Sequence, residues 1–313
     1  MEIRGLIPAT LTPFTGDNQV DLPALVTHVQ RVAAASGLFG IAVNGHAGEV
    51  LALSSGERAA VVRTAREALS PHLKLIAGVE SHSIDGLVRE GLRARQAGAE
   101  LLLVIPPFDI RVFRHLAHDT QASFSVFERL EREVGLPMIV FQYPDNSGCA
   151  YSTEALVRIA ELENVVGVKV STPEVARYVE MYEALKGRVA VLPAADAAPL
   201  LGMLLHGADG ALIGISVVGT PHWSELVKEA TVGNAQHAKE LFNRVCIPLM
   251  EGIFEHQLPR GLVNHFAATK EALLQLGQLR CAQVRPPLIK PDSPRKAAIR
   301  HALVAAGLLK TSA

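Results

Sequence analysis

One lysine stands inside an apolar run where a charged side chain is rarely found. Lys169 belongs to the sequence VVGVKV at 165–170, a continuously apolar stretch typical of a buried strand. Burial disfavours the ammonium form and lowers the pKa of a lysine, by up to about 3–5 units when burial is complete. The neutral amine that results is a nucleophile able to form a Schiff base with a carbonyl compound. The alternative is a lysine at a strand end whose amine extends to solvent or pairs with a carboxylate.

The sequence GHAGE at 45–49 follows another apolar run and contains two glycines, Gly45 and Gly48, separated by two residues. Glycines at this spacing let backbone amides point at one spot and bind a small anion such as a carboxylate. Glu49 is then placed either to cap the following helix or to hold the loop. Taken alone, the pattern also fits an ordinary turn between a strand and a helix.

Other polar side chains give weaker signals. His115 and His118 have the spacing of metal ligands, but without a third ligand they are better interpreted as surface residues. Glu80 and His82 end a further apolar run, where they either polarise a substrate hydroxyl or bond to each other. Asp196 is interpreted first as a helix N-cap and second as a substrate contact. We therefore expect no metal site and no cofactor.

Eight short apolar runs alternate with longer helical patterns along the chain. Between the runs, residues 54–69 start with a serine cap and place Glu57 for a capping box, and residues 152–161 start with another Ser/Thr cap. The apolar runs are 5–11, 38–43, 73–79, 100–106, 136–143, 164–170, 188–193 and 209–216.

This alternation predicts an α/β fold, a (β/α)₈ TIM barrel with a C-terminal helical extension. A doubly wound open sheet is disfavoured, because no Gly-rich nucleotide loop follows the first run. We expect the barrel to cover residues 1–230 and to carry the active site. The extension should cover residues 231–313, since no strand pattern follows residue 216.

Catalytic residues of such barrels lie at the C-terminal ends of the strands and in the loops that follow. The rule brings together four parts of this chain. They are PATLTPF at 8–14, NGHAGE at 44–49, FQYPDNSG at 141–148, and Lys169.

The composition excludes several classes of protein. Thirty basic residues against thirty-one acidic ones leave no basic excess for nucleic acid, and aromatic residues are only 5%. Cys149, Cys246 and Cys281 are odd in number and widely spaced, which fits a reducing cytoplasm better than a disulfide framework. The apolar N-terminal run is broken by prolines, and the apolar region 189–221 is interrupted by polar residues. Neither a signal peptide nor a membrane span is expected.

Taken together, these segments resemble the dihydrodipicolinate synthase/N-acetylneuraminate lyase family, whose members are Schiff-base-forming class I aldolases and lyases on (β/α)₈ barrels. The resemblance runs over nearly the whole length. It implies that Lys169 is the Schiff-base lysine, that pyruvate or another 2-oxo acid is the partner of the imine, and that the chain forms a homotetramer or homodimer. The segments that carry it include GLIPATLTPF (5–14), GIAVNGHAGEVLALSSGER (40–58), LPMIVFQYPDNSG (136–148), NVVGVK (164–169) and HGADGALIG (206–214).

Several positions depart from the family pattern. Two threonines usually precede the GE of the carboxylate-binding loop, where this chain has His46 and Ala47. Phe141 stands where the family has a tyrosine that moves protons to and from the imine. The loop 145–148 lacks the arginine with which the synthases hold their second substrate, and the segment 106–113 lacks a second tyrosine. These departures argue against a true dihydrodipicolinate synthase.

We therefore expect an aldolase or dehydratase that acts through Lys169 on pyruvate, another 2-oxo acid or a deoxy sugar acid. Tyr143 is the first candidate to replace Phe141 in proton transfer, because alternate side chains of a strand project from the same side. His46 is the second candidate, because an imidazole titrates near neutral pH. The residues expected to bind substrate are Gly45, His46, Ala47, Thr12, Phe141 and Leu212. The alternative function is a 2-oxo-acid-binding or sensor protein without efficient turnover.

Overall fold

The protein is described by a computed structural model over residues 1–106, 119–254 and 265–310. These ranges contain eight strands, each within one of the eight predicted apolar runs. They are β1 Gly5–Pro8, β2 Gly40–Val43, β3 Lys74–Val79, β4 Leu101–Val104, β5 Met138–Gln142, β6 Val165–Val170, β7 Ala190–Pro193 and β8 Gly210–Ile213.

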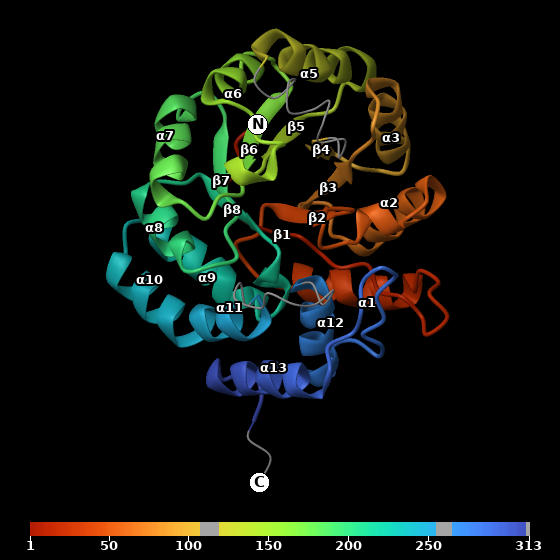
Figure 1. Cartoon of the computed structure of the whole chain (residues 1–313), viewed down its shortest axis with the longest axis vertical. Helices are drawn as coiled ribbons and strands as arrows, with labels where there is room; N and C mark the ends of the chain where they lie inside the picture. The colour runs from red at the N-terminus through yellow and green to blue at the C-terminus, as the bar shows by residue number, and fades with distance from the viewer. Residues whose placement is uncertain (107–118, 255–264, 311–313) are drawn as a thin grey trace.

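The strands form a closed parallel barrel. Strands β2 to β7 pair in sequence order, and β1 pairs with β8. A parallel bridge between Ala9 and Ala42 joins the β1 side to β2. On the other side, the N–H of Asp209, next to β8, donates to the carbonyl of Val191 in β7 at 3.2 Å. The predicted (β/α)₈ TIM barrel is therefore confirmed, and Figure 1 shows its ring of helices around the strands.

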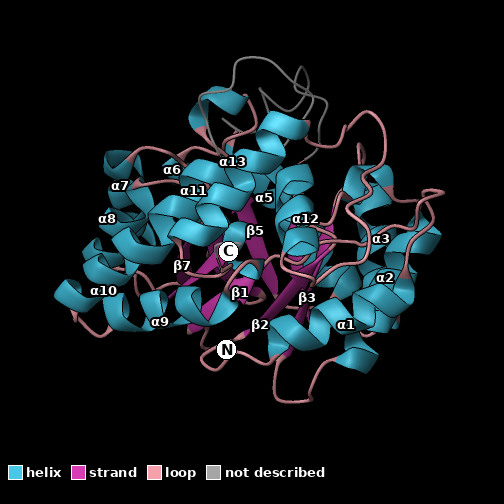
Figure 2. Ribbon diagram, turned by 90° about the horizontal axis from the view of Figure 1, so that it is seen from below, coloured by secondary structure: helices cyan, strands magenta, loops and turns pink. Residues whose placement is uncertain are grey.

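Helices cover the outside of the barrel, with the strands enclosed between them (Figure 2). Helix α2 begins as predicted, because the Ser54 hydroxyl accepts from the amide of Glu57 and the Glu57 carboxylate accepts from the amide of Ser54. The barrel helices that the structure describes are α1 Leu22–Ala33, α2 Ser55–Ala68, α3 Ile84–Gln96, α5 Thr120–Val134, α6 Thr153–Ile159, α7 Val175–Leu185, α8 Pro199–His206 and α9 Thr220–Thr231. Single 3₁₀ turns are η1 Val50–Ala52, η2 Asp145–Ser147 and η3 Ile215–Val217.

The described chain after α9 contains helices and no strand, as the sequence predicts. Helices α11, α12 and α13 pack against one another beneath the barrel in the view of Figure 1. The boundary of the extension at residue 231 stays a prediction, and α9 ends at that residue. No helix in the described ranges is long and apolar enough to cross a membrane. The elements are α10 Ala235–Leu241, a π-helical turn Phe242–Cys246, α11 Ile247–Ile253, α12 His265–Gln275 and α13 Ser293–Ala305.

Candidate active site

Lys169 lies near the C-terminal end of β6, beside Phe141 of β5 in the register of the sheet. Its neighbours Val168 and Val170 are fully buried, whereas Lys169 is half-buried because its side chain lines a cavity. The amine nitrogen lies 3.4 Å from the centre of the Phe141 ring. Burial lowers the pKa of Lys169 to about 7, against the opposing effect of the Asp196 carboxylate. A large fraction of the amine is therefore neutral and nucleophilic near pH 7.

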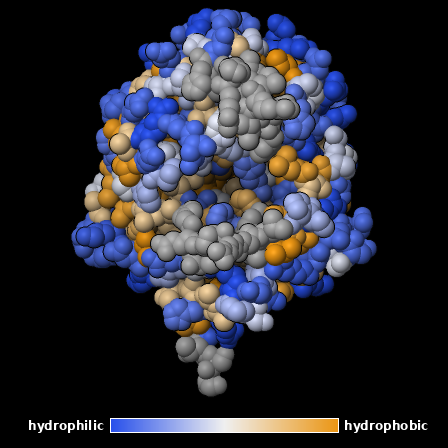
Figure 3. Space-filling view, in the orientation of Figure 1, coloured by the Kyte–Doolittle hydropathy of each residue, from blue (hydrophilic) through white to orange (hydrophobic). Residues whose placement is uncertain are grey.

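The cavity around this amine has a volume of about 530 Å³. Figure 3 shows a hollow near the centre of this face of the molecule. Phe254, His265 and Phe266 also line the cavity, so the C-terminal helices complete a site whose other walls come from the barrel. Six of the residues predicted from the sequence lie on its wall, namely Gly45, His46, Ala47, Phe141, Lys169 and Leu212.

The aromatic rings beside Lys169 form a stack that leads to a histidine. The Phe141 and Tyr143 ring centroids are 4.5 Å apart with an interplanar angle of 18°, so both side chains leave the chain on the same side, as strand alternation predicts. The Tyr143 hydroxyl oxygen lies 2.5 Å from His46 Nε2. Tyr143 does not line the cavity, whereas His46 does. The imidazole therefore stands between the phenol and the cavity.

Burial keeps both members of this Tyr143–His46 pair uncharged. Burial, together with the charge of Lys169, lowers the pKa of His46 to about 3. Burial also raises the pKa of the Tyr143 phenol, and the nearby Cys149 and Glu80 raise it further. A neutral imidazole can accept the proton of the Tyr143 hydroxyl at Nε2 in the tautomer that carries its own proton on Nδ1. The pair can pass a proton without either group being charged at rest.

The loop after β2 holds His46 in a tight turn. The amide of Gly48 donates to the carbonyl of Gly45 at 3.0 Å, and the amide of Glu49 donates to the carbonyl of His46 at 3.0 Å. The N–H of Gly48 is therefore used inside the turn, and the anion nest predicted for this loop stays a prediction. The part of the loop that faces the cavity is Gly45, His46 and Ala47.

Residues 2–306 match the model of the Dihydrodipicolinate synthetase family. This chain belongs to that family. It is 32% identical over 309 residues to the 4-hydroxy-tetrahydrodipicolinate synthase of Cereibacter sphaeroides, covering 98% of this chain and 100% of that protein. Membership confirms the prediction of an enzyme, a carbon–carbon or carbon–oxygen lyase.

Two solved structures of the Dihydrodipicolinate synthetase family are similar in sequence as well as fold. Dihydrodipicolinate synthase from Acinetobacter baumannii, complexed with pyruvate, superposes with a TM-score of 0.86 at 26% identity, covering 98% of this chain and 100% of that one. YagE from Escherichia coli, also in complex with pyruvate, has a TM-score of 0.85 at 25% identity and covers 98% of this chain and 99% of that one.

The surroundings of two residues, Thr12 and Asp196, differ from those predicted. Thr12 is 1% exposed and does not line the cavity. Its hydroxyl lies behind the loop, where a β-carbon added to Gly48 would approach it to 3.3 Å. Asp196 is not a helix N-cap, because α8 starts three residues later at Pro199. The Asp196 carboxylate instead accepts the amide of Ile215 at 2.9 Å and lines the cavity, and its second interpretation, a substrate contact, stays a prediction.

Glu80 does not pair with His82, which is exposed. One Glu80 oxygen accepts from Arg58 at 2.8 Å, and the other is buried with no hydrogen-bond partner among the described residues. Arg58 also donates to the carbonyl of Val50 and so ties α2 to the segment after the His46 loop. The HxxH pair His115 and His118 lies outside the described residues.

The sequence reasoning missed a buried cation behind the His46 loop. Lys270 of α12 has 0% exposure, and its amine lies 2.5 Å from a carboxylate oxygen of Glu49. The backbone amide of Arg285 donates to the other Glu49 oxygen at 3.1 Å. Of the two roles predicted for Glu49, it therefore holds the loop and does not cap a helix. The one available signal was the position of Lys270 within AATKEALL, a stretch of small and apolar residues.

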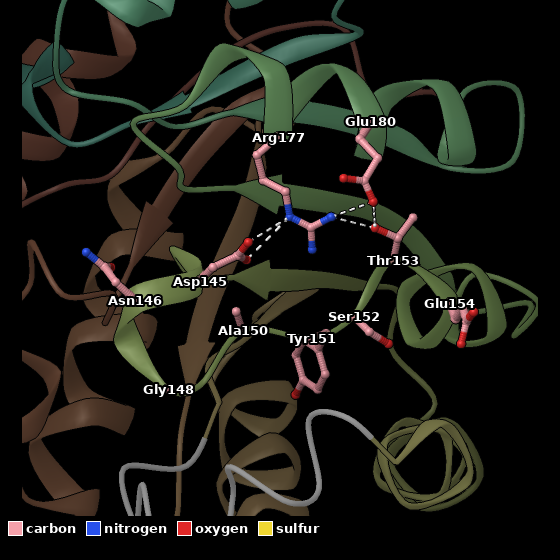
Figure 4. A pocket seen from close by; sticks show the side chains of 10 residues that line it. All are labelled: Asp145, Asn146, Gly148, Ala150, Tyr151, Ser152, Thr153, Glu154, Arg177 and Glu180. Carbon is pink, nitrogen blue, oxygen red and sulfur yellow. Dashed lines mark hydrogen bonds and ion pairs between the residues drawn. The ribbon is translucent and has the colours of Figure 1, made fainter.

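A second hollow of about 920 Å³ lies beside the Lys169 cavity and shares Asn146 with it. Figure 4 shows Arg177 of α7 pointing there toward Asp145, with Glu180 and Thr153 on its other side. The guanidinium of Arg177 is thus held by protein groups. Among the described residues, no arginine lines the cavity of Lys169.

Proposed function

We propose that this chain is a Schiff-base-forming lyase in which Lys169 attacks the keto carbon of pyruvate or of a larger 2-oxo acid. The proposal depends chiefly on one observation, the amine of Lys169 in a cavity with its pKa lowered to about 7. The two related structures that contain pyruvate support the substrate class. Attack of the amine and loss of water give an imine, which takes up the electrons of the neighbouring carbon–carbon or carbon–oxygen bond as that bond breaks.

The carboxylate of the 2-oxo acid is assigned to the turn Gly45–Ala47. This turn lines the same cavity as Lys169, and it lies in the segment that resembles the family's carboxylate-binding loop. Phe141 and Leu212 supply apolar parts of the cavity wall. Water is thereby kept away from the imine, which strengthens every electrostatic contact made there.

Proton transfer is assigned to the Tyr143–His46 pair. Once bond cleavage has left an enamine, its carbon takes a proton from His46 Nδ1 and the imine is restored, while Tyr143 passes its phenolic proton to Nε2 and becomes a phenolate. The reverse sequence starts from the phenolate form of Tyr143 and removes a proton from the same carbon. The hydrogen bond of 2.5 Å between the Tyr143 hydroxyl and His46 Nε2 supports this relay.

We further propose that this enzyme is not a dihydrodipicolinate synthase and that the second half of its substrate is uncharged. Asp196 lines the cavity, and a second substrate carboxylate would be repelled by it. Asn146, Ser171 and Thr172 offer amide and hydroxyl groups suited to the hydroxyls of a deoxy sugar acid. Relatives named as 4-hydroxy-tetrahydrodipicolinate synthases would then differ from this chain in substrate.

We also propose a cytoplasmic homodimer or homotetramer, as the family resemblance implies. Cys246 and Cys281 are free thiols, which accords with a reducing compartment. Light scattering on the purified protein measures the assembly, and a monomer at micromolar concentration would contradict it.

The decisive experiment is borohydride trapping with pyruvate, followed by digestion and mass measurement of the peptides. We expect an adduct on Lys169 that is absent from Lys169→Ala. Turnover is then measured on a panel of 2-oxo acids and deoxy sugar acids, with aspartate semialdehyde plus pyruvate as the synthase reaction. Trapping at Lys169 with no turnover on any substrate would favour the 2-oxo-acid-binding protein over the lyase.

A further inference from the structure

The loop that carries His46 is anchored by helix α12 and by the segment between α12 and α13. Both oxygens of Glu49 are used there, one by the amine of Lys270 at 2.5 Å and one by the amide of Arg285 at 3.1 Å. Lys270 also donates to the carbonyl of Gln283 at 2.9 Å and lies 4.2 Å from the centre of the Phe14 ring. The two charged side chains are 0% and 2% exposed. A fully buried pair of this kind is weak evidence of stabilisation, so its placement calls for another account.

His46 is held through its ring contacts and through the loop that carries it. Its imidazole is hydrogen-bonded to Tyr143 and lines the Lys169 cavity and a further cavity of about 400 Å³, which Glu49 and Phe266 also line. The turn that carries its backbone ends at Glu49, whose own backbone is in the left-handed conformation with φ of 54°. A displacement of Glu49 would therefore move the backbone of His46.

One helix connects this anchor with the substrate cavity. Phe266 and Lys270 are four residues apart in α12, so they lie on the same face of the helix. Phe266 lines the cavity in front of His46, and Lys270 binds Glu49 behind it. A shift of α12 would therefore reach the loop and the cavity together.

We propose that Lys270 is a positioning residue, which acts through its buried ion pair with Glu49 to hold His46 at the distance that proton transfer requires. This inference rests on the proposed function, in which Lys169 forms the imine and the Tyr143–His46 pair moves the proton. The ion pair should matter for proton transfer and not for imine formation, because Lys169 is on β6 and makes no contact with Glu49 or Lys270 in the described structure. The C-terminal helices thus supply part of the catalytic geometry.

The test uses the double variant Glu49→Gln/Lys270→Met, which removes both charges and leaves none stranded. The control is Leu303→Ala in α13, a fully buried residue that loosens the same helices without touching the loop. Two rates are measured with pyruvate: borohydride trapping at Lys169, and exchange of the methyl protons for deuterium, which needs both the imine and proton transfer. Nitrogen NMR of the His46 ring reports its hydrogen bond to Tyr143 without any substrate.

We expect the double variant to trap pyruvate within about twofold of the parent rate and to lose methyl exchange by about 10–100-fold, since misplacement by about 1 Å can cost about 10² in rate. Its His46 signal should shift, whereas Leu303→Ala should keep both the signal and the exchange rate. A double variant with unchanged exchange overturns the proposal, and so does an equal loss of exchange in Leu303→Ala. If the parent protein neither traps nor exchanges pyruvate, the proposed function fails, and an unshifted His46 signal then overturns the positioning role separately.

Discussion

Lys169 and Lys270 both carry an amine into the interior of this protein, but with different surroundings. Lys270 is 0% exposed and bound to Glu49 and to the carbonyl of Gln283. Lys169 faces a cavity, has the ring of Phe141 at 3.4 Å, and makes no hydrogen bond through its amine with any described residue. Burial lowers the pKa of both, to about 8 for Lys270 and about 7 for Lys169.

The difference between the surroundings of Lys169 and Lys270 shows that burial alone does not make a lysine reactive. The amine of Lys270 is held by a carboxylate, a carbonyl and an aromatic face, which leave no room for a substrate carbonyl. Lys169 has the π face of Phe141 beneath it and open space in front of it. A ring face attracts the ammonium ion more weakly than a carboxylate does, so losing the proton costs less at Lys169.

Replacing the amines separately gives the largest expected effect on activity. Lys169→Ala should lower turnover by about 10⁴-fold or more, because removal of a covalent nucleophile abolishes the chemical route. Its thermal midpoint should stay close to that of the parent protein, since the side chain leaves an existing cavity. A turnover assay and calorimetry measure the two quantities, and borohydride trapping measures imine formation. Full trapping in Lys169→Ala would transfer the nucleophile to another lysine.

Lys270→Met should differ from Lys169→Ala, because its main effect should be on stability. It strands the Glu49 carboxylate in a buried site, which should lower the free energy of unfolding by about 3–5 kcal/mol. The double variant Glu49→Gln/Lys270→Met should recover much of that loss. Urea unfolding followed by circular dichroism measures both, and the parent protein provides the reference. Equal stability of Lys270→Met and the parent would show that the Glu49 carboxylate finds water or another partner.

Lys169 could be predicted from the sequence and Lys270 could not, for a physical reason. A lysine in a six-residue apolar strand conflicts with its surroundings, and the conflict is local. Lys270 lies in a helix where lysine is common, and its partner Glu49 is 221 residues away. The Tyr143–His46 pair is similar: each residue was identified as a candidate, but their contact across 97 residues depends on the closure of the barrel.

The barrel itself was predictable because its pattern repeats eight times, whereas the error at Asp196 concerned a single boundary. The helix after β7 was expected to begin at Asp196, but Pro199 occupies its first turn and starts it three residues later. Asp196 was thereby left to accept the amide of Ile215 and to line the cavity. The residue at which a helix begins is set by such local competition and does not follow from the periodicity of the sequence.

The Tyr143–His46 pair near Lys169 can be tested for its proposed role in proton transfer. His46→Ala should lower kcat by about 10²-fold, toward the smaller end for a lost acid–base group, because water can enter the vacated space. Tyr143→Phe should lower it less, since His46 stays in the cavity. Trapping of the imine should persist in both variants. A larger loss in Tyr143→Phe than in His46→Ala would mean that the phenol reaches the substrate directly.

The smallest effect, about tenfold per pH unit, concerns the pH dependence of imine formation. Below the pKa of about 7, Lys169 is protonated and cannot attack, so the rate of trapping should rise about tenfold per unit up to pH 7 and then level. His46 has its pKa near 3 and the Tyr143 phenol has a raised pKa, so neither produces a break in this range.

Lys270, with a pKa of about 8, is the one other of these buried groups that could produce a break near pH 7. The double variant Glu49→Gln/Lys270→Met, which lacks it, should keep the same profile. A break that moves in the double variant would assign the titration to the ion pair. A break near pH 10 would mean that water reaches the amine of Lys169 as freely as in solution, and the contrast between the two lysines would then lose its basis.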